Sequence, residues 1–231
     1  MPAPEHIHPA LWRATQLARG AARCVATGHA TLSAQLPGGG WPLGALIELL
    51  HPHPGLGEVR LLQPALGQLP GGRDIVLVQP PHVPHSACWM QWRLNPARLL
   101  WIDPARPADA LWATEQILRH GTCGALLCWL PQVRAESLRR LHLAAQGGDT
   151  LFFALRPAAA ARHASPAPLR LALDSAPGGL SVRILKRRGP PCDLPFTLML
   201  DAGPPAVSHA PLDRRLPAQP AAGRRAPALV P

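Results

Sequence analysis

A glycine-rich stretch in the first third of the chain has the residue types of a loop that could bind phosphate. It runs from Leu36 through Gly44 and continues at Gly55. A phosphate loop needs glycines whose backbone N–H groups surround the phosphates, a lysine for the terminal phosphates and a Ser or Thr hydroxyl for magnesium. Glu58 and Val59 stand where the lysine and the hydroxyl are expected. Because a carboxylate repels a triphosphate, the sequence predicts a degenerate phosphate loop (Gly55, Gly57, Glu58) and no bound cofactor.

Metal-binding and nucleophilic chemistry are poorly supported. His82, His85 and Cys88 have regular spacing, and His51 and His53 offer a second pair, but prolines dominate the first loop and no paired cysteine motif accompanies them. The sequence predicts no metal site. No nucleophile elbow is present, and the serines in Pro- and Ala-rich loops are Ser86, Ser165 and Ser175. We therefore expect no hydrolase activity and no catalytic residues.

Composition indicates one α/β domain with an anionic partner. A chain of 231 residues, 47% of them hydrophobic, is long enough for a sizeable core. The net charge of +10 comes almost wholly from arginine, because Lys186 is the only lysine, and it favours nucleic acid or an acidic protein surface as the partner. Arginine together with abundant alanine and proline is also typical of a GC-rich genome.

The cellular compartment follows from the cysteines and from the length of the apolar runs. Five cysteines, irregularly spaced and odd in number, argue against a disulfide framework and indicate free thiols in a reducing compartment. No apolar run approaches the roughly 18 residues of a membrane span. We predict a cytoplasmic protein that does not act in a membrane.

Apolar periodicity predicts strands that alternate with helices. The predicted strands cover 45–50, 75–78, 99–102, 125–129, 151–155, 169–173, 180–185 and 196–200. The predicted helices cover 9–24, 58–69, 107–120 and 134–146, with a short one through Trp89 and Trp92. Residues 176–179 give a hairpin signal between the late strands. The pattern predicts an α/β fold with a mainly parallel sheet flanked by helices and antiparallel C-terminal edge strands.

Three segments are predicted along the chain. Residues 1–26 form an N-terminal helical extension and 27–202 form the core domain. Residues 203–231 are a Pro-, Ala- and Arg-rich tail with few large apolar residues, for which we predict disorder.

Several motifs in order carry a resemblance to a known family. They are Leu11-Trp-Arg13, the stretch from Leu36 to Pro42, Gly57-Glu58, Pro80-Pro-His82, Arg139-Arg-Leu141 and Lys186-Arg-Arg-Gly189. Over residues 9 to 200 the chain resembles the ImuA family, RecA-like accessory proteins of damage-induced mutagenesis in bacteria. The resemblance implies a RecA-like core and a role in SOS-induced, error-prone translesion DNA synthesis. It implies as partners an ImuB-like polymerase-related protein, an error-prone polymerase III alpha-type subunit and RecA, with DNA contacted indirectly.

The resemblance also implies that the protein is not an enzyme. A RecA-type ATPase needs the loop lysine, a carboxylate that positions water and an aspartate for magnesium. Glu58 replaces the first, Pro80 and Pro81 occupy the region of the second, and Trp129 sits where the third would end its strand. We predict a degenerate ATPase site that does not hydrolyse ATP.

Seven residues are predicted contacts to DNA or a partner. They are the basic turn Lys186, Arg187 and Arg188, the loop residues Arg156 and Arg162, and the tryptophans Trp12 and Trp41. Basic clusters can contact phosphates or acidic surfaces, and large aromatics often carry interface energy. A solvated charged surface and ordinary core packing remain open for the same residues.

Two other functions stay open. One is an SOS-induced division inhibitor, related in fold to RecA, that acts on the tubulin-like division protein; the extended C-terminal sheet with its basic turn disfavours it. The other is an active ATP-dependent recombination regulator, which an ATPase assay would test.

Overall fold

The computed structural model describes residues 23–189 and 194–200. Their main element is an eight-stranded sheet with strands in the order β10-β9-β8-β3-β7-β6-β4-β5. The strands are β3 (Ala45–His51), β4 (Ile75–Val78), β5 (Leu99–Ile102), β6 (Ala125–Trp129), β7 (Leu151–Pro157), β8 (Leu169–Ala176), β9 (Gly179–Lys186) and β10 (Phe196–Met199). All neighbours from β8 to β5 are parallel, and β8, β9 and β10 pair antiparallel.

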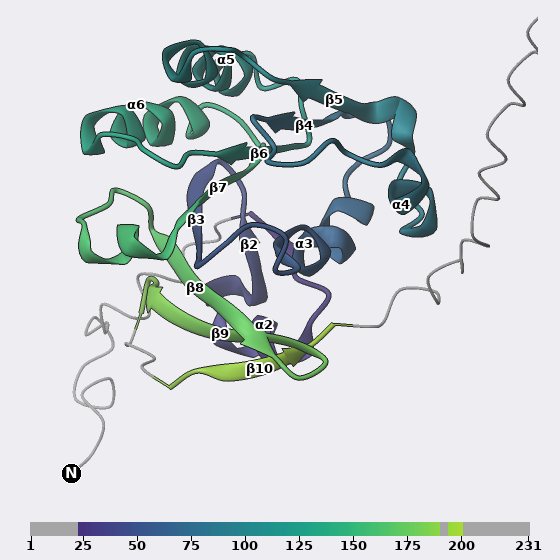
Figure 1. The fold of residues 1–231 in the computed structure, drawn as a ribbon, viewed down its shortest axis with the longest axis vertical. Helices are drawn as coiled ribbons and strands as arrows, with labels where there is room; N and C mark the ends of the chain where they lie inside the picture. Colours follow the sequence, from purple (N-terminus) through teal and green to yellow (C-terminus); the bar gives the residue numbers. More distant parts are fainter. Residues whose placement is uncertain (1–22, 190–193, 201–231) are drawn as a thin grey trace, which may run out of the picture.

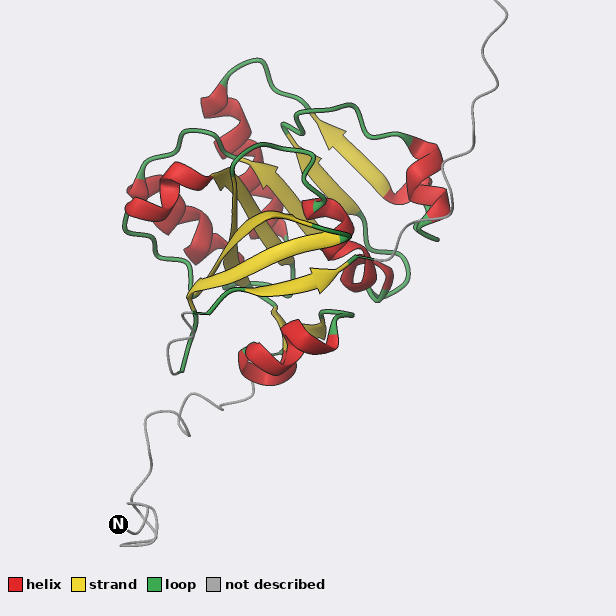
Figure 2. Cartoon of the chain, turned by 60° about the horizontal axis from the view of Figure 1, so that its bottom comes forward, coloured by secondary structure: helices red, strands yellow, loops and turns green. Residues whose placement is uncertain are grey.

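Helices cover both faces of the sheet (Figures 1 and 2). They are α2 (Ala30–Gln35), α3 (Glu58–Gly67), α4 (Ser86–Gln91), α5 (Pro107–His120) and α6 (Ala135–Ala145). Short 3-10 turns lie at η2 (Pro37–Gly39), η3 (Pro96–Arg98) and η4 (Ala158–Arg162). The α/β class and the mainly parallel sheet are confirmed, whereas the RecA-like arrangement is not.

The sheet separates two hydrophobic clusters because successive side chains of a strand point to opposite faces. Leu46 and Phe152 pack on the side of α5 and α6, while Ile47 and Phe153 pack on the side of α2, α3 and α4. The face that carries α5 and α6 is the one on which the candidate surface described below is built.

The N-terminal segment differs from the prediction. Cys24–Ala26, expected at the end of a helical extension, form strand β1, which pairs antiparallel with β2 (Gly40–Pro42). The pairing of β1 with β2 makes residues 24–26 part of the folded core, so the predicted boundary at 26 falls too late. The rest of the predicted helix, to residue 22, and the predicted tail 203–231 lie outside the described residues.

Gly28 shows why the chain can turn between β1 and α2. Its φ of +80° lies in the left-handed region, and a Cβ at this position would lie 2.1 Å from Cβ of Pro64 in α3. Pro64 stands inside α3, which runs on to Gly67. Within the described ranges, no helix is both long and apolar enough to cross a membrane.

Candidate functional site

The glycine-rich loop before α3 is occupied by its own glutamate. Glu58 begins α3 and is 3% exposed. Its Oε1 accepts a hydrogen bond from the Gly55 N–H at 3.0 Å, and its Oε2 accepts one from the Gly57 N–H at 3.1 Å. A carboxylate at a helix N-terminus is also favoured by the helix dipole. Glu58 therefore takes two of the backbone donors that a phosphate loop would offer to a nucleotide.

Gly57 allows this arrangement. Its φ is +116°, which a residue with a side chain rarely adopts, and it immediately precedes the first helical residue. The turn directs both N–H groups toward the Glu58 side chain that follows.

His51 ends β3 close to this loop and is 4% exposed. Neither ring nitrogen has a hydrogen-bond partner in the structure. Burial lowers the pKa of His51, and the nearby Glu58 carboxylate opposes that shift. Burial of His51 thus disfavours its charged form.

The spaced histidines and Cys88 are not gathered into a metal site in the described part of the chain. His82, His85 and Cys88 are exposed. In residues 23–189 and 194–200, no group of three His, Cys, Asp or Glu side chains could hold a metal ion.

Two predicted contact residues are buried in the core, so neither can reach a partner. Arg156 is 5% exposed, and its Nη1 donates to Glu48 Oε1 at 2.5 Å. Arg170 donates through Nε to the other oxygen of Glu48, and this places an Arg156–Glu48–Arg170 triad across the neighbouring strands β7, β3 and β8. Trp41 is fully buried and packs edge-to-face on Phe153, with ring centroids 5.3 Å apart. A partner role for Arg156 and Trp41 is therefore wrong.

The basic turn is tied to the rest of the domain. Lys186 Nζ donates to the Ser165 carbonyl at 2.9 Å, and Arg187 donates to the Gln35 carbonyl of α2. Arg188 is exposed, as is Arg162 at the end of η4. Lys186 and Arg187 thus hold loops together, and a contact role for this turn stays a prediction. Trp12 lies outside the described residues.

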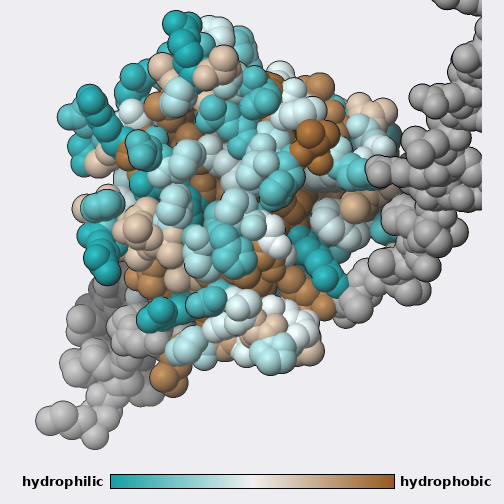
Figure 3. Space-filling model, in the orientation of Figure 1, coloured by the Kyte–Doolittle hydropathy of each residue, from teal (hydrophilic) through white to brown (hydrophobic). Residues whose placement is uncertain are grey.

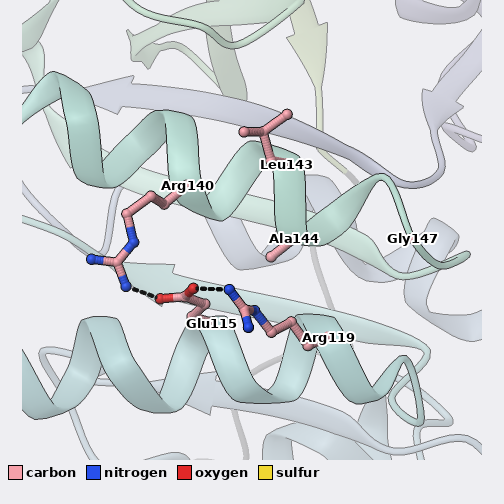
Figure 4. Close-up of a pocket in the computed structure, with 6 residues that line it drawn as sticks. All are labelled: Glu115, Arg119, Arg140, Leu143, Ala144 and Gly147. Carbon is pink, nitrogen blue, oxygen red and sulfur yellow. Dashed lines mark hydrogen bonds and ion pairs between the residues drawn. The ribbon is translucent and has the colours of Figure 1, made fainter.

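A second triad, on the surface, escaped the sequence analysis. Glu115 of α5 accepts from Arg119 at 2.7 Å and from Arg140 of α6 (Figure 4). The Glu115 side chain is 6% exposed, whereas those of Arg119 and Arg140 are 64% and 67% exposed. The four-residue spacing of Glu115 and Arg119 was a visible signal for a pair on one helix face, but the third member comes from another helix.

Hollows flank this surface triad along α5 and α6. One, of about 440 Å³, is lined by Arg119, Arg140 and Leu143 among others. The next, of about 280 Å³, is lined by Leu111, Trp112 and Ser137 among others. Both share Glu115 and Arg140, so they lie next to each other. We call these two hollows with their triad the α5–α6 groove.

Sequence comparison relates the chain to bacterial proteins that share one name. Relatives from Pectobacterium carotovorum and Pectobacterium atrosepticum are each 36% identical to it, over 102 and 105 residues. A relative from Serratia marcescens is 28% identical over 115 residues. All three are named cell division inhibitor SulA.

The matches are partial. They cover 42%, 43% and 49% of the chain and 59%, 61% and 68% of the respective relatives. The chain thus spans about 60% of the length of the two Pectobacterium proteins. No family model matches the chain.

One solved structure shares the same name. The crystal structure of SulA from Pseudomonas aeruginosa is 26% identical and aligns over 48% of this chain and 97% of its own, with a TM-score of 0.41. That TM-score does not establish a common fold, so the functional inference depends on the sequence relatives.

These comparisons correct the resemblance drawn from the motifs. Membership of the ImuA family is wrong, because the relatives found are named SulA. The predicted roles in DNA repair and translesion synthesis are therefore wrong as well. The same holds for the predicted partners, which were an ImuB-like protein, the polymerase, RecA and DNA. The alternative of a division inhibitor is the one that the relatives favour. Their name describes inhibitors and not enzymes, in agreement with the prediction of a non-enzymatic protein.

Proposed function

We propose that this protein inhibits bacterial cell division by binding the tubulin-like division protein, and that it is made as part of the SOS response. The observation that carries the proposal is the 36% identity over 102 residues to a protein named cell division inhibitor. An SOS-induced division inhibitor was the alternative that the sequence left open. Expression after DNA damage would delay division while the DNA is damaged.

The geometry of the phosphate loop supports a binding protein over an ATPase. Glu58 takes the N–H groups of Gly55 and Gly57 within the folded chain. A nucleotide would have to displace a buried carboxylate and would meet its charge, so we propose that the loop stabilises the fold and does not hydrolyse ATP. Inhibition then depends on surface complementarity alone.

The surface is suited to a polar partner. On the face seen in Figure 3, hydrophobic areas are small and are separated by hydrophilic ones. Together with the net charge of +10, this favours a partner surface that is acidic.

Cell length under controlled expression tests the proposal. Induced expression in a bacterium that carries the matching division protein should give long cells without septa while growth in mass continues. A variant in which Glu48 is replaced by glutamine, expressed at the same level, controls for the load of making the protein, because it should fold poorly. Cells of normal length at full expression of the folded protein would contradict the proposal.

Damage-induced expression is tested in the same organism. The protein should be absent from undamaged cells and should appear after DNA damage, when a deletion strain should elongate less than the parent. Constant expression in damaged and undamaged cells would remove the SOS part of the proposal and leave the inhibition itself standing.

A further inference from the structure

The α5–α6 groove has more positive than negative charge. Its one buried carboxylate, Glu115, is shared by Arg119 and Arg140. Each arginine donates to Glu115 through Nη2 and keeps further N–H groups that face outward, because about two thirds of each side chain is exposed. The triad has a formal charge of +1. Glu115 holds both guanidinium groups in place and leaves some of their N–H donors available to another acceptor.

Apolar side chains stand beside these cations. Trp112 on α5 is 64% exposed and Leu143 on α6 is 59% exposed. Trp112 lines the smaller hollow and Leu143 lines the larger one. A large exposed tryptophan beside fixed arginines has the composition of an interface hot spot, since Trp and Arg are the residues enriched there.

The two features define what would fit. An occupant needs carboxylates to reach Arg119 and Arg140, and it needs an apolar side chain to cover Trp112 and Leu143. Nucleic acid supplies the negative charge, but its phosphates would gain nothing from Leu143. An acidic protein segment with an apolar residue satisfies both requirements.

We propose that the α5–α6 groove is the surface that binds the division protein, through an acidic segment of that partner which also carries an apolar anchor. This inference rests on the proposed function and names the surface that carries it out. The acidic side chains pair with Arg119 and Arg140, which Glu115 positions, and the anchor packs on Trp112.

Substitution of Leu143 separates charge from apolar contact. Leu143 is exposed at the rim of the groove, and both glutamate and lysine are good helix formers, so Leu143→Glu and Leu143→Lys should fold equally well. Leu143→Glu adds a negative charge at the rim of the groove and should weaken binding of the purified division protein about tenfold. Leu143→Lys loses the same apolar contact but adds a positive charge, so it should bind more tightly than Leu143→Glu.

Trp112→Ala tests the anchor. It should also weaken binding about tenfold, as expected for an interface tryptophan. Met90→Ala is the matched control, because Met90 is an apolar residue of α4, is 59% exposed and lies outside the groove. It should leave the dissociation constant unchanged. Circular dichroism and melting temperature of each variant, compared with the unmodified chain, show that the fold is kept.

The outcomes separate the two proposals. The groove is supported if the unmodified chain binds, if Trp112→Ala weakens that binding, if Leu143→Glu weakens it more than Leu143→Lys does, and if Met90→Ala leaves it unchanged. Three results would overturn the groove: binding that none of these variants changes, equal weakening by Leu143→Glu and Leu143→Lys, or binding of DNA oligonucleotides in place of the division protein. In each case the inhibitory function is still judged by cell length. Absence of binding by the unmodified chain overturns the proposed function and this inference with it.

Discussion

Two Arg–Glu–Arg triads lie within the described part of this protein, and they differ chiefly in burial. In the core triad, Glu48 is fully buried between Arg156 and Arg170. In the surface triad, Glu115 is almost buried but Arg119 and Arg140 are about two thirds exposed. The residue types are identical, so the difference in role comes from what surrounds them.

The remaining donors of the arginines show what the difference means. Arg170 of the core triad also donates to the carbonyls of Ala160 at 2.8 Å and His163 at 3.1 Å, which fixes η4 against the sheet. The arginines of the surface triad point their remaining donors to solvent. A buried triad of this kind specifies and stabilises a fold, whereas an exposed one is available for recognition.

Removing the central carboxylate should give the largest effect and should separate the triads. Glu48→Gln leaves two arginines in a buried site without a counter-charge and should lower the free energy of unfolding by about 3–5 kcal/mol. Glu115→Gln, the matched variant, should cost about 1 kcal/mol, because its arginines remain solvated. Urea denaturation of both measures the difference, and equal losses would show that burial does not distinguish the triads.

The Glu58 loop extends the comparison to a carboxylate that is paired with backbone donors instead of arginines. Glu58→Ala should cost about 1–3 kcal/mol, because two backbone N–H groups lose their acceptor. The two free N–H groups should then bind an added anion. Inorganic phosphate should therefore raise the melting temperature of the variant and leave that of the unmodified chain unchanged. Glu136→Ala is the control, since Glu136 is also in a first helical turn but is exposed. An equal phosphate response in all three proteins would contradict a loop closed by its own side chain.

His51 sharpens the comparison as a buried ionisable group without a hydrogen-bonded counter-ion. Burial lowers its pKa below the ordinary value of 6.5, so below that pH the unfolded chain binds a proton that the folded chain does not. As far as His51 is concerned, the free energy of unfolding should therefore be highest above pH 6.5 and should decrease as the pH falls below 6.5.

The slope of stability against pH should be smaller in His51→Gln, measured by urea denaturation between about pH 5.5 and 7.5. His142, whose pKa is lowered by burial and by Arg188 and Lys186, contributes in the same direction, so part of the slope should remain. A slope that His51→Gln leaves unchanged would mean that His51 is not held neutral.

The smallest effect is expected at the edge of the surface triad. Arg119→Ala should change the free energy of unfolding by about 0.5 kcal/mol or less, because Arg119 is exposed and Glu115 keeps Arg140. The small loss should disappear at high salt, which screens exposed pairs. A salt-independent loss several times larger would place the surface triad with the core triad as a structural element.

Local pattern predicted most of the sheet. Strands β3 to β9 were expected from apolar runs bounded by glycine and proline, and the hairpin between β8 and β9 was expected from 176–179, where Ala176 pairs with Gly179. The pair β1 and β2 was missed, because each strand has three residues and their pairing is a contact that no local periodicity reports.

Residue roles were harder to predict than elements. Arg156 looked like a surface contact because its partner Glu48 lies 108 residues earlier in the chain. Glu58 was singled out from the sequence as the residue in place of a loop lysine, but only the structure shows that its carboxylate accepts hydrogen bonds from Gly55 and Gly57. The glycine-rich motif, one of several that suggested the ImuA family, marks a type of loop and not a function. The relatives found are instead named cell division inhibitors.

The central claim is tested most directly by polymerisation of the division protein in the presence of this purified chain. Purified tubulin-like division protein, assembled with its nucleotide and sedimented, should give less polymer as the purified chain is added. The loss should approach completion near equimolar protein and should not require ATP. An unchanged amount of polymer in an excess of the folded chain would contradict the account.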